Sequence, residues 1–86
     1  MNRVDWLRER LARLEPISLE IRDESDQHAG HAGARQGGHY AVTIVAACFA
    51  NLPTVRRHRL VYDAVGDLMQ NGIHALSIVA KAPQEL

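Results

Sequence analysis

The chain has 86 residues, of which 47% are hydrophobic, and its 10 lysines and arginines balance its 10 aspartates and glutamates. This length and composition predict one soluble globular domain spanning residues 1–86, and the zero net charge argues against binding nucleic acid through charge alone. A single cysteine cannot form an internal disulfide, and the longest apolar run, residues 40–50, is too short to cross a bilayer. We therefore expect a cytoplasmic protein that does not enter a membrane.

The first third of the chain predicts a helix followed by a strand. Residues 3–14 carry apolar side chains at helical spacing, Asn2 is a suitable N-cap, and Pro16 ends the helix. Residues 17–23 alternate between apolar and polar side chains, which is typical of a half-buried strand.

The middle of the chain predicts a long loop and a second strand. Residues 24–38 contain four glycines and show no hydrophobic period, and loops of this length are often functional. Residues 39–49 are rich in β-branched and apolar residues, so we expect a central strand. Cys48 falls at its end, where we expect a small hydrophobic side chain rather than a catalytic thiol.

The last third predicts a second helix over residues 54–71 and a third strand over residues 73–82. Asn71 and Gly72 form a natural helix stop because both tolerate a left-handed backbone. The predicted order is therefore α-β-β-α-β. A strand that follows a helix usually runs parallel to a neighbour, so we expect an α+β fold with a three-stranded mixed sheet and helices on one face.

Four histidines are candidates for metal binding. His28 and His31 lie in the glycine-rich loop, His39 lies at its end, and neutral imidazole binds many transition metals. His74 begins the last strand with the same parity as the core-facing positions, which favours a buried, hydrogen-bonded histidine. A residue at the mouth of a strand can also point toward adjacent loops, so a ligand role stays open for His74.

A cluster of cations begins the second helix. Its members are Arg56, Arg57, His58 and Arg59. Such a cluster is typical of a phosphate or nucleic-acid contact, although a solvated helix end with one packed histidine explains it equally well. We find no nucleophile elbow, phosphate-binding loop, dinucleotide fingerprint or paired carboxylates, so we do not expect an enzyme.

Four segments give the chain a resemblance to the BolA family. They are Asp23-Glu24-Ser25 followed by His28, His39-Tyr40-Ala41-Val42, the run from Arg57 to Tyr62, and Ile73-His74-Ala75-Leu76. The last two, at the correct spacing in one short chain, are the most specific. The resemblance implies a fold like the class II KH domain.

The resemblance also implies a function. Members of this family share a [2Fe–2S] cluster with a monothiol glutaredoxin, whose cysteine and bound glutathione supply thiolates. In that picture His74 is one ligand and His28 is a second, with His31 as a substitute because this loop is longer than usual. Replacing thiolates with imidazoles raises the potential of a cluster, and acid should release it because imidazole binds metal only when deprotonated.

Two other functions stay open at this point. Some relatives are transcriptional regulators that bind DNA, and the turn from Arg56 to Arg59 is the natural contact here, although the glycine pair of a KH backbone clamp is missing. A protein that binds a metal alone through His28, His31 and His39 is the third possibility. The leading prediction is a non-enzymatic partner in iron–sulfur trafficking or iron sensing.

Overall fold

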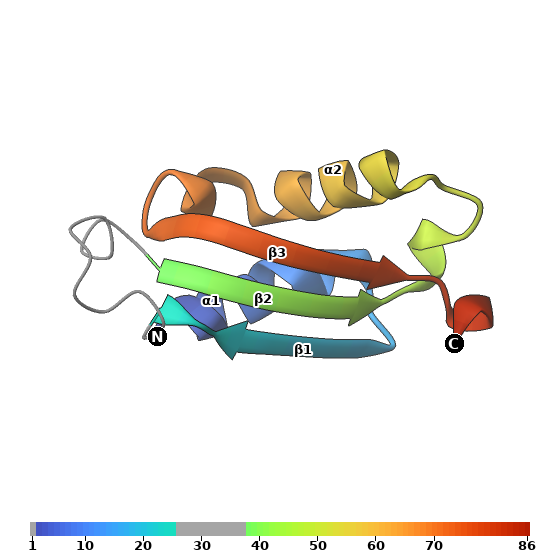
Figure 1. Cartoon of the computed structure of the whole chain (residues 1–86), viewed down its shortest axis with the longest axis horizontal. Helices are drawn as coiled ribbons and strands as arrows, with labels where there is room; N and C mark the ends of the chain where they lie inside the picture. Colours follow the sequence, from blue (N-terminus) through green and yellow to red (C-terminus); the bar gives the residue numbers. More distant parts are fainter. Residues whose placement is uncertain (1, 26–37) are drawn as a thin grey trace.

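The computed structural model describes residues 2–25 and 38–86 of the chain. Its elements follow one another in the predicted order, and Figure 1 shows their arrangement. They are α1 (Arg3–Leu11), β1 (Ser18–Asp23), β2 (Gly38–Val45), α2 (Thr54–Val65) and β3 (Ile73–Lys81). The α-β-β-α-β prediction is therefore confirmed.

The three strands form one mixed sheet in the order β1-β2-β3. β1 pairs antiparallel with β2, from Ser18 opposite Val45 to Asp23 opposite Tyr40. β2 pairs parallel with β3. The central strand is thus β2, as its nearly continuous apolar sequence predicted.

The core lies on one face of this sheet. Along β2 the buried residues Tyr40, Val42 and Ile44 alternate with half-buried residues that face the other way. Both helices add their apolar stripes to the same cluster, in which Leu7, Leu11, Val61, Ala64 and Val65 are buried. Figure 1 shows α1 passing behind the sheet and α2 running beside β3. On the opposite face of the sheet the side chains of β1 and most of those of β3 are exposed, and most of those of β2 are half-buried.

The N-terminus of α1 is closed by the predicted cap. The Asn2 side chain accepts a hydrogen bond from the Asp5 backbone N–H at 2.9 Å, and the Asp5 carboxylate accepts one from the Asn2 backbone N–H in return. This reciprocal capping box satisfies two amides that the helix itself leaves without a partner.

The second strand is shorter than its sequence predicts. β2 ends at Val45, and a 3₁₀ turn over Ala47–Phe49 follows. Ala46 and Phe49 are both fully buried, a spacing that an extended strand cannot place on one face. The expectation that Cys48 packs as a small hydrophobic side chain was wrong, because its side chain is exposed.

The second helix also ends earlier than predicted, at Val65 instead of residue 71. Gly66 adopts a φ of 62°, which stops the helix, and a 3₁₀ turn over Gly66–Met69 brings Leu68 into the core. Arg10 of α1 fixes this junction, since its Nη1 donates hydrogen bonds to the Val65 carbonyl at 3.0 Å and to the Asp67 carboxylate at 2.8 Å. No helix in the described part of the chain has the length and apolar character needed to cross a membrane.

Candidate functional site

The candidate site lies where β2 and β3 begin side by side, at the left end of the sheet in Figure 1. Gly38 pairs with Ile73 and His39 pairs with Ala75, so His74 is an extra residue between two successive pairs. This β-bulge lets both Ile73 and Leu76 pack toward the core although three positions separate them. His74 is therefore exposed, so of the two alternatives that the sequence left open, the buried histidine favoured by its parity is the wrong one.

The bulge brings two imidazoles together. The ring centroids of His39 and His74 lie 5.0 Å apart, with their planes tilted by 44°. His39 is half-buried on the face of β2 opposite the core, because it alternates with the buried Tyr40. Two histidines 35 positions apart in the sequence thus form one pair at an open rim of the sheet.

The backbone of His39 is held from the end of β1. Its N–H donates to the Ser25 hydroxyl oxygen at 3.0 Å, and its carbonyl accepts from the Glu24 N–H at 2.7 Å. Ser25 is tied in turn to Asp23, whose Oδ1 accepts from the Ser25 N–H at 2.9 Å. Hydrogen bonds from the side chain and backbone of Ser25 hold the pKa of the Asp23 carboxyl below its ordinary value. The sequence pattern did not predict this arrangement, although Asp23 and Ser25 both belong to the Asp23-Glu24-Ser25 motif.

The other two predicted metal ligands, His28 and His31, lie outside the described residues. Within residues 2–25 and 38–86, no group of three or more histidine, cysteine, aspartate or glutamate side chains gathers as a metal site would require. Of His28, His31 and His74, the structure therefore describes only His74, and its ring lies beside that of His39.

The basic turn divides into an internal part and an exposed part. The Arg57 guanidinium binds both carboxylate oxygens of Glu85 at 2.6 Å and donates to the carbonyls of Leu52 at 2.7 Å and Ala80 at 3.0 Å. Arg57 thus joins α2 to β3 and to the C-terminal 3₁₀ turn. Arg56 and Arg59 are exposed.

Two hollows lie beside this turn. Arg56 and Arg59 border one of about 270 Å³ together with Leu52, Leu60 and the acidic Asp63. His58 is half-buried, and it borders an adjoining hollow together with Arg59 and Tyr62. Of the three arginines in this turn, only Arg56 and Arg59 could therefore bind a ligand without breaking hydrogen bonds inside the protein.

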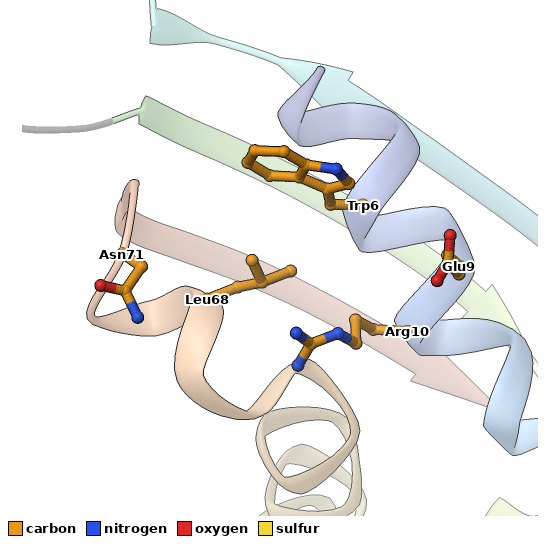
Figure 2. A pocket seen from close by; sticks show the side chains of 5 residues that line it. All are labelled: Trp6, Glu9, Arg10, Leu68 and Asn71. Carbon is orange, nitrogen blue, oxygen red and sulfur yellow. The ribbon is translucent and has the colours of Figure 1, made fainter. Parts of the chain in front are cut away.

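A separate pocket of about 420 Å³ opens between α1 and the turn after α2. Figure 2 shows the Trp6 ring and Leu68 on its walls, with Glu9 and Arg10 from α1 and Asn71 from the turn after α2 around them. Two of its polar groups already bind the protein, since Arg10 pairs with Asp67 and the Asn71 amide donates to the Asp67 carbonyl at 2.9 Å. The lining residues include neither an imidazole nor a thiol.

The exposed thiol of Cys48 stands apart from the imidazole pair. Its Sγ lies 3.9 Å from the Leu14 carbonyl oxygen. Partial burial raises the pKa of this thiol, which lowers the thiolate fraction at neutral pH.

Comparison with known proteins identifies close relatives. The sequence matches the family described as BolA-like protein over residues 11–85. The solved structure of BolA1 from Arabidopsis thaliana superimposes with a TM-score of 0.87 and 44% identity, and the match covers 100% of this chain and 97% of that one. The fold class and the resemblance predicted from the sequence are both confirmed.

Curated proteins agree with this assignment. BOLA1 of Arabidopsis thaliana, a chloroplastic protein, is 46% identical over 89 residues, and SufE-like protein 1 of the same plant is 45% identical over 87 residues. The chain spans only 56% and 24% of their lengths. A protein of Vibrio cholerae named DNA-binding transcriptional regulator BolA is 41% identical over 71 residues, which cover 83% of this chain and 65% of that protein. None of these three names describes an enzyme. This chain belongs to the BolA-like protein family.

Proposed function

We propose that this chain supplies two imidazole ligands to one iron of a [2Fe–2S] cluster, which it shares with a monothiol glutaredoxin and glutathione. The observation that carries the proposal is the pair formed by His39 and His74. The predicted place of this activity is the cytoplasm, whereas the names of two Arabidopsis relatives assign those proteins to chloroplasts or mitochondria.

The geometry of the pair supports binding to a single metal ion. Two imidazoles on one tetrahedral ion, with nitrogen–metal distances of about 2.0–2.1 Å, have ring centroids about 5 Å apart. The observed separation is 5.0 Å. Rotation of the two rings would then direct one nitrogen of each at the same point. We assign the second ligand to His39 on this ground, and His28 and His31 remain the competing assignments.

The number of ligands also supports a shared cluster. In a [2Fe–2S] cluster two sulfides bridge the irons, so each iron needs two further ligands, and in Rieske centres two imidazoles occupy one iron. The two imidazoles would fill one iron, and the thiolates of glutaredoxin and glutathione would fill the other. The exposure of His74 leaves room for a second protein to approach.

The test is reconstitution of the complex. The purified chain is mixed with a monothiol glutaredoxin, glutathione, iron and sulfide, and the product is analysed by size-exclusion chromatography and visible circular dichroism. We expect a heterodimer with one cluster and a spectrum distinct from that of the glutaredoxin alone. His58→Ala is the control, because it removes a histidine on α2 and leaves the pair of His39 and His74 intact. This variant should form the same complex as the wild-type chain. A spectrum and stoichiometry equal to those of glutaredoxin alone would reject the proposal.

A second candidate function is DNA binding through Arg56 and Arg59. It is supported by their exposure and by the name of the Vibrio cholerae relative. Titration of a DNA duplex at several salt concentrations tests it. Micromolar affinity that falls steeply with salt, and that is reduced by the double substitution of both arginines with alanine, would favour this function. Binding that is absent at moderate salt would exclude it.

A further inference from the structure

The place where β1 ends and β2 begins carries hydrogen bonds that the strands alone do not require. The ladder between β1 and β2 ends with Asp23 opposite Tyr40, so His39 is the first residue beyond the regular pairs. On its other side the pairing with β3 shifts register between Gly38 and His39. The backbone of His39 therefore lies at an irregularity on both sides. On the β1 side the His39 carbonyl accepts the Glu24 N–H at 2.7 Å, while the His39 N–H finds its partner in a side chain.

Ser25 supplies this side chain. Its hydroxyl oxygen accepts the His39 N–H at 3.0 Å, across 14 positions of sequence. Asp23 fixes Ser25 by accepting its backbone N–H at 2.9 Å and interacting with its side chain. Asp23 thus holds the backbone of Ser25, whose hydroxyl oxygen accepts the His39 N–H.

We infer that Asp23 and Ser25 are positioning residues, which hold the backbone of His39 so that its imidazole stays beside that of His74. The inference about geometry concerns the free protein. Its consequence for cluster binding rests on the proposed function. Neither residue touches the metal in this account, and both act through His39.

A positional role has a signature that a general effect on stability would not produce. Loss of the Ser25 hydroxyl removes the partner of one specific amide, so the His39 N–H should exchange with solvent about tenfold faster. Amides in the middle of β2, such as that of Val42, should keep their rates. The contact between the two imidazoles should weaken together with the protection of the His39 amide.

The experiment measures amide hydrogen exchange and nuclear Overhauser contacts between the two imidazole rings, by NMR of the free protein. The variants are Ser25→Ala, Asp23→Asn and Ser25→Thr, and Ser18→Ala at the far end of β1 is the matched control. We expect Ser25→Ala to speed exchange at His39 about tenfold and to weaken the ring contact, Asp23→Asn to do so less, and Ser25→Thr to restore both. Ser18→Ala should change neither.

An unchanged His39 exchange rate and ring contact in Ser25→Ala would overturn the inference. Equal acceleration of every amide in β2 would overturn it too, because it would show a general loss of stability. These readouts need no cluster, so they remain decisive even if reconstitution with glutaredoxin fails. If the cluster forms with the wild-type chain, Ser25→Ala should lower the affinity of the complex about three- to tenfold, as expected for a misplaced rather than a missing ligand.

Discussion

Removing one imidazole of the pair tests the ligand assignment in quantitative terms. The ring centroids of His39 and His74 lie 5.0 Å apart, so each imidazole lies within a sphere of that radius around the other. One group in such a sphere corresponds to an effective concentration of about 3 M, well above the millimolar values of flexible linkers. A second ligand held at such an effective concentration raises affinity by about 10²–10⁴-fold. We therefore expect His39→Ala or His74→Ala to weaken the cluster-bridged complex by about 10³-fold, which corresponds to about 4 kcal/mol.

The assay is titration of cluster-loaded glutaredoxin with each variant, followed by visible circular dichroism, with unfolding in urea as a separate measurement. His74 is exposed, so His74→Ala should change the free energy of unfolding by no more than about 0.5 kcal/mol. Affinity should thus fall while stability is maintained. The double variant should reveal strong coupling between the two positions, because each imidazole contributes fully only when the other is bound.

One result would refute the assignment of the second ligand. If His39→Ala weakens the complex less than about threefold, while His28→Ala or His31→Ala weakens it as much as His74→Ala does, the second imidazole comes from the glycine-rich segment. If none of the four substitutions weakens the complex, the chain supplies no imidazole to the cluster.

Three further predictions concern folding. Phe49→Ala removes a fully buried ring, so the free energy of unfolding should fall by about 3–5 kcal/mol in urea titrations, and a loss below about 1 kcal/mol would contradict this description of the core. Gly38→Ala would place a methyl group within 2.6 Å of Cζ of the buried Tyr40 ring, so we expect a loss of about 1–3 kcal/mol, and an unchanged thermal midpoint would contradict the close approach. Hydrogen bonds from Arg57 lower the pKa of Glu85 from 4.5 to about 2, so this ion pair stabilises the fold fully above about pH 4.5 and loses that effect as the pH falls to about 2. Glu85→Gln should therefore be less stable than the wild type near pH 6 and nearly equal to it near pH 2, whereas a difference that does not vary with pH would contradict the role of the ion pair.

The order of the elements could be predicted because each has a clear local signal. The helical spacing of Leu7 and Leu11, the Asn2 cap and the β-branched run of β2 all act within a few residues. Their ends were harder to predict. The early ends of β2 and α2 depend on where Phe49 and Leu68 reach the core, which is a property of the packed molecule.

The candidate site could be predicted only in part. Resemblance to a family singled out His74, but simple alternation placed it on the buried side, and no local pattern predicts the bulge that turns it outward. The nearness of His39 depends on the register between two parallel strands that a helix separates in sequence. The role of Arg57 was equally hidden, because its partners lie on β3 and in the C-terminal turn.

The most direct test of the central claim is nitrogen hyperfine spectroscopy of the reduced cluster in the complex. The chain is labelled with ¹⁵N-histidine, and the glutaredoxin and glutathione are left unlabelled. We predict two ¹⁵N couplings of the size expected for imidazoles bound to iron, and the loss of one of them in His74→Ala. A cluster without coupling to ¹⁵N, ligated by sulfur alone, would contradict the account.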